Sequence, residues 1–251
     1  MPGTLPLRQY DVVIADIDGC LASEGQKAFD LARLAAVAEH NRLAVENGDR
    51  PLVTVCSGRP QPFAESICRM IGNLLVPCVA EMGVWTYHPG TNRYEMDPAI
   101  RAEHLDAVHA LAAWCAAEFA PKGVSQQPGK NASVTLWHPD TVFLKSLQPK
   151  VQAECDRRGW PFRVTSTWYY INCELTHVSK GSGLDRVLNE LKIPRDRLAG
   201  IGDTVGDRCI ADRVAFFACP SNAHPAIKEH AHYISPYAEA EGVVDILARL
   251  R

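Results

Sequence analysis

The stretch VVIADIDGCL, residues 12–21, decides the fold of this chain. Its apolar run, Val12–Ala15, is short and partly β-branched, which is typical of a buried strand in a parallel sheet. Asp16, Asp18 and Gly19 then break the run abruptly. Two carboxylates one residue apart are costly after such a strand unless a cation or a reaction needs them. An ordinary Asp-Gly turn is the competing interpretation, and the rest of the chain disfavours it.

Three further polar motifs occupy similar positions, each directly after a strand-like run or at the start of a helix. In open α/β sheets, chemistry gathers just beyond the carboxyl ends of the strands, so we expect these motifs to share one site. They are SGR at Ser57, Gly58 and Arg59, a single lysine at Lys180, and GDTVGD with Asp203 and Asp207. Together with the aspartates of the first motif they supply a nucleophile, an anion cradle and metal ligands.

Strand-like and helical segments alternate at both ends of the chain, which predicts an α/β fold with a Rossmann-like, doubly wound parallel sheet. In the first part, the expected strands are residues 10–16, 52–56 and 76–80, and the expected helices are residues 27–47 and 62–71. In the last part, the expected strands are residues 198–201 and 215–219, and the expected helices are residues 182–191, 207–213, 225–231 and 242–250.

The middle of the chain departs from this alternation. Its pattern predicts a hairpin at residues 85–96, helices at residues 100–119 and 142–158, and strands at residues 132–137, 162–165 and 168–175. Helices and antiparallel strands inserted into a βαβ chain are typical of a separate α+β lobe. We therefore expect a core made of residues 1–82 and 177–251 and an inserted lobe made of residues 83–176.

Length and composition limit the classes of function. A chain of 251 residues fits one large domain or two modest ones. The net charge of −3 gives no electrostatic reason to expect nucleic acid or an anionic membrane as a partner. No apolar stretch approaches the ~20 residues that span a bilayer, and the N-terminus lacks the pattern of a secretory signal.

The cysteines and histidines do not follow the patterns of a metal site. The nine cysteines are scattered and include no CxxC pair, which favours a reducing, cytoplasmic compartment over a zinc or disulfide site. Cys20 is the one that could be accessible, although a structural role is favoured for it too. The nine histidines form no HxxxH or HExxH pattern, so none is assigned to a metal.

The order DxDG, SGR, a lone lysine before a helix and GDxxxD resembles the haloacid-dehalogenase superfamily of phosphotransferases. More narrowly, it is similar to the Cof-like branch, which includes sugar-phosphate and phosphoglycolate phosphatases. The resemblance covers nearly the whole chain, and residues 83–176 are its least diagnostic part. In that family, a lobe inserted between the SGR motif and the lysine is a C2-type cap. Two residues depart from the family pattern, since Cys20 replaces the usual Thr and Met82 replaces a frequent Asn.

The resemblance implies a phosphatase that uses Mg²⁺ and acts on a small phosphorylated metabolite. Asp16 is the candidate nucleophile, which would form an aspartyl-phosphate, and Asp18 is the candidate general acid and then base. Asp16 and Asp203 can supply hard oxygen ligands for Mg²⁺. By resemblance the backbone carbonyl of Asp18 is a third ligand, and Asp207 acts from farther away or through water.

The same resemblance suggests how the substrate is bound. Ser57, Gly58 and Lys180 are the candidate ligands of the phosphoryl oxygens, through a hydroxyl, a backbone N–H and a compact positive charge. Further candidates for contacts with the rest of the substrate are Arg59, Lys130, Asn131, Tyr169, Asn172 and Asn222. The identity of the metabolite and the oligomeric state are left open by the sequence.

Two alternatives use the same motifs. A phosphomutase of the same superfamily would return the phosphoryl group to its substrate, and a non-catalytic relative would only bind a phosphate or a sugar. A dehalogenase is disfavoured because it needs neither a metal nor a second aspartate. A receiver domain is disfavoured because Glu81 stands after the strand where its phosphorylated aspartate would be.

Overall fold

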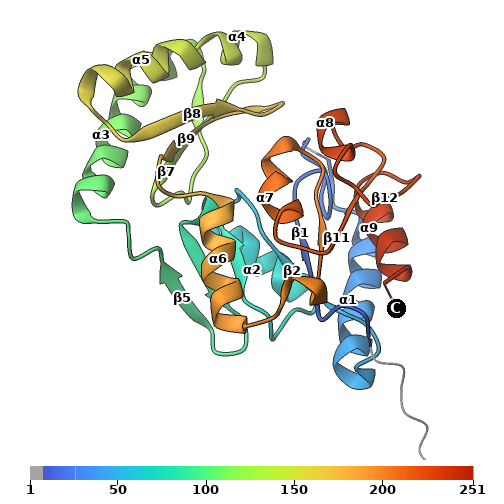
Figure 1. The fold of residues 1–251 in the computed structure, drawn as a ribbon. Helices are drawn as coiled ribbons and strands as arrows, with labels where there is room; N and C mark the ends of the chain where they lie inside the picture. The colour runs from blue at the N-terminus through green and yellow to red at the C-terminus, as the bar shows by residue number, and fades with distance from the viewer. Residues whose placement is uncertain (1–7, 26, 251) are drawn as a thin grey trace, which may run out of the picture.

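A parallel sheet forms the centre of the computed structural model, which describes residues 8–25 and 27–250 (Figure 1). Its strand order is β12-β11-β10-β1-β2, and all neighbouring strands run parallel. The strands are β1 (Val12–Ala15), β2 (Leu52–Val55), β10 (Leu198–Ile201), β11 (Phe216–Cys219) and β12 (Tyr233–Ile234). The expected α/β fold with a doubly wound parallel sheet is thus confirmed.

Helices cover both faces of this sheet, which is why β1 is apolar throughout. Val13 and Ala15 belong to a buried cluster with side chains of α1, α2 and α9, whereas Val12 and Ile14 join a second cluster with α6, α7 and α8. These helices are α1 (Leu31–Asn47), α2 (Gln61–Met70), α6 (Lys180–Leu191), α7 (Arg208–Ala211), α8 (Pro225–Lys228) and α9 (Glu239–Ala248).

The first helix begins later than the sequence predicted. We expected it from residue 27, but α1 starts at Leu31. Asp30 is the N-cap, and its carboxylate accepts a hydrogen bond of 3.0 Å from the Arg33 N–H. The cap therefore ends the preceding loop at a defined residue, which the apolar spacing alone did not reveal.

A small antiparallel sheet extends the core. It consists of β3 (Cys78–Ala80), β4 (Trp85–His88) and β5 (Arg93–Met96). β3 also touches the parallel sheet through a parallel bridge between Cys56 and Val79. Tyr87 packs in the same buried cluster as α1 and α2. The boundary expected at residue 83 assigns this hairpin to the inserted lobe, whereas its pairing and packing connect it with the core.

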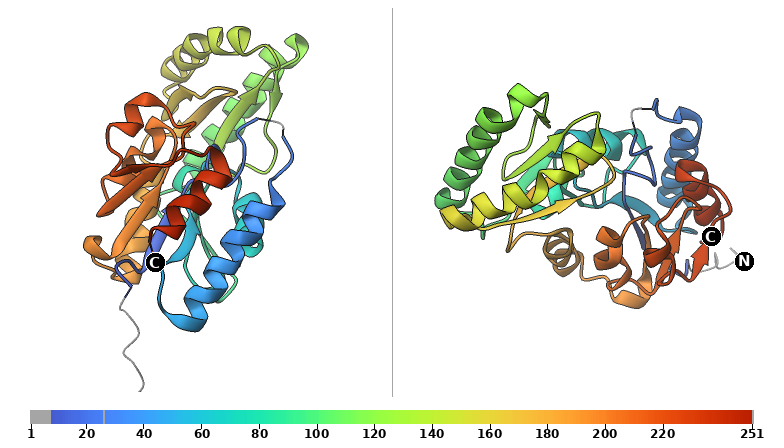
Figure 2. Two further views of the ribbon diagram at one scale, coloured as in Figure 1. Left: turned by 90° about the vertical axis from the view of Figure 1, so that its right-hand side faces the viewer. Right: turned by 90° about the horizontal axis from the view of Figure 1, so that it is seen from above.

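The inserted lobe has its own sheet and its own apolar cluster. The sheet is antiparallel with the order β6-β7-β9-β8, and Figures 1 and 2 show α3 and α5 on the side away from the core. Leu111 of α3, Leu136 of β7 and Ile171 of β9 are fully buried between these layers. The elements are α3 (Ala102–Phe119), β6 (Ser125–Gln126), β7 (Ser133–Trp137), α4 (Thr141–Ser146), α5 (Gln148–Arg158), β8 (Phe162–Ser166) and β9 (Tyr170–Leu175).

One predicted helix of the lobe is two helices in the structure. We expected a single helix over residues 142–158, but α4 ends at Ser146 and α5 starts at Gln148. Pro149 explains the break, because a proline lacks the N–H that a helix interior requires and fits the first turn of a new helix. Four 3-10 helices complete the elements: η1 (Glu81–Gly83), η2 (Ala120–Lys122), η3 (Arg195–Arg197) and η4 (Val205–Asp207).

The start of α6 presses closely on η1. A Cβ atom on Gly183 would lie 2.6 Å from Val79 Cγ1 and 2.8 Å from the Cα of Gly83. A Cβ on Gly83, whose φ is +101°, would lie 2.0 Å from the carbonyl oxygen of Ser179. Only glycines allow this approach, which brings the N-terminus of α6 to the end of the sheet. Within the described residues, every helix is too short or too polar to cross a membrane.

We predict that Gly183→Ala destabilises the chain by about 1–3 kcal/mol, because the added methyl group must displace the Val79 side chain and the η1 backbone. Asn189→Ala, at an exposed position of the same helix, is the control and should stay within about 0.5 kcal/mol of the wild type. Urea unfolding followed by circular dichroism measures both free energies. Equal stability of the two variants would contradict the close contact.

Candidate active site

The polar motifs of the sequence meet at one end of the parallel sheet. Asp16 directly follows β1, SGR comes two residues after β2, and Asp203 comes two residues after β10. Lys180, the first residue of α6, reaches into the same place. Its Nζ lies 2.8 Å from Asp16 Oδ2 and 2.8 Å from Asp207 Oδ1. Lys180 thus joins the first motif to the GDTVGD motif through two buried carboxylates.

Negative charge exceeds positive charge in this cluster. Asp16, Asp203 and Asp207 are buried, and each offers an oxygen within 4.8 Å of the others. Burial, followed by the charges of Asp207 and Asp16, raises the pKa of Asp203 to about 9. Burial and Asp207 also raise the pKa of Asp16 well above its usual value. The cluster has three carboxylates and only one ammonium, that of Lys180. A divalent cation would balance the excess negative charge.

Asp207 and Asp203 have different surroundings. Asp207 Oδ2 accepts hydrogen bonds from the N–H groups of Asp203, at 3.1 Å, and Thr204, at 3.0 Å. Burial raises the pKa of Asp207. The charge and hydrogen bond of Lys180 lower the pKa by more than burial raises it, so the net shift is downward. Asp203 Oδ1 is buried and has no hydrogen-bond partner among the described residues. Asp207 therefore organises the loop, and Asp203 presents a free oxygen.

This donor set fits Mg²⁺. The carboxylate oxygens are hard ligands, one of them is orphaned, and the excess charge is negative. Gly19 makes the approach of Asp203 feasible, because a Cβ there would lie 2.0 Å from Asp203 Oδ2. With its φ of +72°, Gly19 also adopts a conformation that side chains disfavour. Only glycine therefore fits at position 19, because any side chain there would collide with the carboxylate of Asp203.

The SGR loop lies beside the acidic cluster. Ser57 is fully buried, and its Oγ accepts a hydrogen bond of 3.2 Å from the Arg59 N–H. Gly58 lines the cavity, and a Cβ there would lie 3.0 Å from Met82 Sδ. Met82, which stands where the family often has Asn, thus packs directly behind the loop that is expected to hold phosphate.

Arg59 has a partner that the sequence did not predict. Arg59 lines the cavity, as a residue expected to contact the substrate would, and its Nε also donates to both oxygens of Asp18, at 2.8 and 3.0 Å. Its guanidinium also lies over the rings of Phe63, at 5.0 Å, and Tyr170, at 5.7 Å. Arg59 therefore connects the candidate acid to an aromatic side chain of the inserted lobe. The order of residues along the chain carried no signal for this pair.

A cavity of about 740 Å³ lies between these core motifs and the lobe sheet. The strands of the lobe turn one face to their own apolar cluster and the other to the cavity. Thr135 of β7, Thr165 of β8 and Asn172 of β9 lie on the cavity side, and Thr135 Oγ1 donates to Asn172 Oδ1 at 2.9 Å. The roof of the cavity is therefore polar and rich in hydroxyl and amide groups.

Charged and aromatic side chains complete the cavity wall. Arg163 Nη2 donates to Glu174 Oε2 at 2.8 Å, so each offsets the charge of the other. The Lys145 ammonium lies 5.5 Å from the ring centroid of Trp168. Trp168 and Tyr170 present ring surfaces to the same space.

The expected substrate contacts of the lobe divide into two groups. Lys130 and Asn172 line the cavity, whereas Asn131 and Tyr169 are not among its described lining residues. Asn131 Oδ1 instead accepts a hydrogen bond of 3.1 Å from the Trp85 indole N–H. Tyr169 lies in the turn before β9, where strand alternation does not hold its side chain toward the cavity.

Asn222 also has a structural partner in place of a ligand. Its Nδ2 donates to the carbonyl of Gly19 at 2.8 Å, and its Oδ1 accepts from the Glu239 N–H at 2.7 Å. It is absent from the described lining of the cavity. Asn222 thus fastens the start of α9 to the turn after β1, and supports the site from behind.

The cysteines do not supply a nucleophile. Cys20 is fully buried, and burial followed by the nearby carboxylates of Asp203 and Asp16 raises its pKa well above the usual value. Cys209 lines the cavity, and burial raises its pKa to about 11. Both thiols are therefore protonated at neutral pH, and the carboxylates are the candidates for covalent chemistry.

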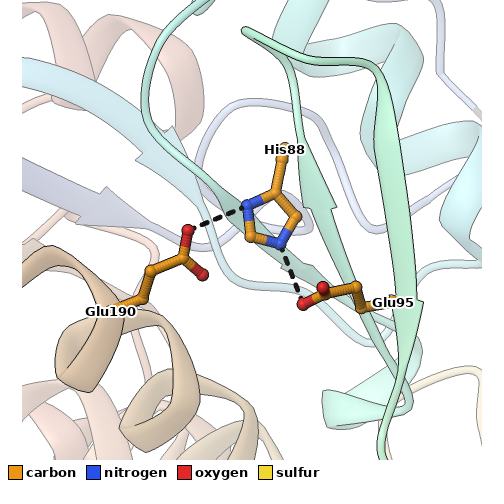
Figure 3. A group of neighbouring side chains, drawn as sticks. All are labelled: His88, Glu95 and Glu190. Carbon is orange, nitrogen blue, oxygen red and sulfur yellow. Dashed lines mark hydrogen bonds and ion pairs between the residues drawn. The ribbon is translucent and has the colours of Figure 1, made fainter.

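A second group of possible metal ligands lies away from the cavity (Figure 3). His88 Nε2 is 3.3 Å from Glu95 Oε2, and His88 Nδ1 is 3.4 Å from Glu190 Oε1. The Arg93 guanidinium contacts Glu95 at 3.1 Å and Glu190 at 3.3 Å, so both carboxylates already have a cation. This group is an ion-pair network that fastens the β4–β5 hairpin to α6.

Comparisons with known proteins agree with this geometry. Residues 128–247 match the family model of haloacid dehalogenase-like hydrolases. A phosphoglycolate phosphatase of Methanothrix thermoacetophila is 34% identical over 91 residues, which are 36% of this chain and 41% of that protein. A phosphoglycolate phosphatase of Methanospirillum hungatei is 24% identical over 235 residues and is aligned over 94% of both chains. The first alignment thus spans less than half of the relative, and the second nearly all of it.

Solved structures share the whole fold. A Thermoplasma acidophilum protein has a TM-score of 0.71 at 18% identity, covering 96% of this chain and 98% of that one. The sucrose-phosphatase of Synechocystis, solved with sucrose and phosphate, has a TM-score of 0.65 at 17% identity, covering 97% and 98%. At these identities the likeness concerns the fold. The likeness confirms the expected fold class, and the family model and the curated relatives confirm the family resemblance and the enzyme class expected from the sequence: over residues 128–247 the chain matches the haloacid dehalogenase-like hydrolases.

Proposed function

We propose that this chain is a Mg²⁺-dependent phosphatase that hydrolyses a small phosphorylated metabolite through an aspartyl-phosphate on Asp16. The observation that carries this proposal is the buried group of three carboxylates and Lys180 at the edge of the 740 Å³ cavity. Relatives named phosphoglycolate phosphatase and a structural neighbour named sucrose-phosphatase support a phosphorylated substrate. Within the expected range 83–176, the lobe that follows the β4–β5 hairpin would serve as the C2-type cap over this site.

In the first half of the reaction, a carboxylate oxygen of Asp16 forms a bond to phosphorus while the bond to the leaving-group oxygen breaks. Lys180, Ser57 and the Gly58 N–H would stabilise the phosphoryl oxygens. Asp18 would give a proton to the leaving alkoxide. When bound, Mg²⁺ supplies positive charge that lowers the repulsion between the carboxylate and the dianionic phosphate. Asp16, Asp203 and the backbone carbonyl of Asp18 would hold the ion.

In the second half, water replaces the leaving group. Asp18 would now accept a proton from that water, which attacks phosphorus, releases inorganic phosphate and restores Asp16. Arg59 keeps the Asp18 carboxylate in a defined orientation through its two-oxygen contact. The phosphomutase alternative differs only at this step, since it would exclude water and return the phosphoryl group to the substrate. Release of inorganic phosphate therefore distinguishes the two.

The lobe surface favours a sugar phosphate over phosphoglycolate as the substrate. Thr135, Thr165 and Asn172 offer several hydrogen bonds to a leaving group with many hydroxyls, and Trp168 offers a ring to pack on its carbons. A two-carbon acid would leave most of the 740 Å³ unfilled.

We predict that EDTA abolishes hydrolysis of a small aryl phosphate and that Mg²⁺ restores it. The physical reason is the uncompensated negative charge around Asp16 and Asp203, which repels a phosphate dianion. Colorimetric release of phosphate measures the activity. Asp203→Asn should also weaken Mg²⁺ binding in a calorimetric titration. Full turnover by a metal-free preparation would refute the proposed cofactor.

Substitutions of the two aspartates of the first motif should have different effects on the reaction. Asp16→Asn removes the nucleophile, so covalent phosphorylation and turnover should disappear together. Asp18→Asn should lower turnover by roughly 10²-fold or more, as expected for loss of a general acid, with phosphate still bound. Asp212→Asn, an exposed carboxylate on the core, is the control and should match the wild type. Rapid-quench labelling and steady-state kinetics measure both steps, and wild-type rates in either active-site variant would reject the roles.

Substrate selection should depend on the lobe. Asn172→Ala removes an amide from the cavity, so KM for the preferred sugar phosphate should rise about tenfold while KM for a small aryl phosphate changes little. Tyr169→Phe, close by but outside the cavity lining, is the matched control. Steady-state kinetics on both substrates provides the comparison. If Asn172→Ala lowers kcat/KM for both substrates in the same proportion, specificity lies elsewhere.

A further inference from the structure

Two loops meet behind the SGR motif, and the proposed chemistry assigns no role to their contact. One is η1 of the core, which begins at Glu81, and the other leads from Lys130 into β7 of the lobe. Glu81 is fully buried, and its Oε1 accepts three hydrogen bonds from the lobe. The donors are the Asn131 N–H at 2.8 Å, the Ala132 N–H at 2.8 Å and the Ser133 hydroxyl at 2.9 Å. A carboxylate of the core thus caps the start of a lobe strand.

A second contact runs in the opposite direction. The ammonium of Lys130, from the lobe, donates a hydrogen bond to the carbonyl oxygen of Gly58 in the core. Burial lowers the pKa of Lys130, and the charge of Glu81 opposes this shift, so the two groups stabilise each other in their charged forms. The core and the lobe therefore each supply one charged side chain, which binds the backbone of the other part.

The same contact controls the backbone of the SGR loop. The Met82 N–H donates to the Ser57 carbonyl at 3.1 Å, which orients the peptide whose N–H belongs to Gly58. The Glu81 N–H donates to the Arg59 carbonyl at 2.8 Å. With Lys130 on the Gly58 carbonyl, three successive carbonyls of the loop are held by η1 and by the lobe. The lobe thus holds the Gly58–Arg59 peptide directly, whereas the adjoining peptide that carries the Gly58 N–H is held by Met82 of η1.

The backbone of η1 is strained. Glu81 and Met82 have φ values of +48° and +56°, which residues with side chains seldom adopt. Such conformations persist only where the surrounding contacts over-determine them, and they gather at clamps and switch regions. Here the surrounding contacts are those of the Glu81 carboxylate with the lobe and of the η1 N–H groups with the SGR loop.

We propose that Glu81 and Lys130 form a reciprocal latch that holds the lobe on the core and steadies the SGR loop for phosphate. They are positioning residues, and the inference rests on the proposed role of Gly58 in the phosphatase. The consequence is a coupling between two events. When the lobe opens, the SGR loop loses the support of Lys130, and Glu81 loses the contacts that hold η1 behind the loop. The affinity for phosphate then falls, so opening helps to release inorganic phosphate.

The test combines phosphate binding with amide hydrogen exchange. Glu81→Ala should speed exchange of the Asn131 and Ala132 amides about tenfold and weaken binding of inorganic phosphate about tenfold. Lys130→Met keeps the apolar stem and should weaken phosphate binding similarly. Glu81→Gln, which keeps an acceptor oxygen, should restore most of both properties. Glu95→Gln, from the ion-pair network of the hairpin, is the control and should resemble the wild type.

A double variant makes the test decisive. If the two residues act as one latch, Glu81→Ala combined with Lys130→Met should weaken phosphate binding by less than the product of the single effects. Amide exchange could become faster while the phosphate affinity stays within about twofold of the wild type. The contact would then only dock the lobe on the core, and the proposal would be overturned. Unchanged exchange in Glu81→Ala would overturn it as well. A wild-type chain that binds no phosphate would instead contradict the proposed function, and the latch with it.

Discussion

The structure depends on one buried interaction, the ammonium of Lys180 between the carboxylates of Asp16 and Asp207. Removal of one partner from a buried ion pair typically costs about 3–5 kcal/mol, because the remaining charge is left uncompensated. Several features that otherwise look unrelated serve this contact. The glycines at the start of α6 bring the lysine to the sheet, and the hydrogen bonds of Asp207 hold the loop opposite. The close packing of η1 against α6 is therefore part of the site.

The two ionic clusters differ in charge balance, and this difference distinguishes a structural cluster from a functional one. Around His88, the Arg93 guanidinium contacts both carboxylates, and the network joins a hairpin to a helix. Around Asp203, the carboxylates exceed the lysine, and a buried oxygen has no partner within the described chain. A stable fold alone gains nothing from such an imbalance, which is characteristic of sites that bind a charged group.

Sequence patterns predicted the site better than its surroundings. Apolar runs that end in Asp16, SGR and Asp203 could be recognised because parallel strands bring their carboxyl ends to one edge. The bond between Arg59 and Asp18 could not, since it joins side chains 41 residues apart through the fold. The sequence made Asn222 a candidate for substrate contact, and only its hydrogen bond to Gly19 reveals a structural role. Likewise Asp30 and Pro149 set helix boundaries through local hydrogen bonding, which apolar spacing does not report.

The strand order has a consequence for how the chain folds as it is synthesised. β1 lies between β2 and β10, and Val12 pairs with Leu52 on one side and with Leu198 on the other. β1 therefore waits with one edge open until most of the chain has left the ribosome. Its four buried, apolar residues are a surface that chaperones would recognise during that interval. The lobe, whose contacts are more local, can fold before the core closes.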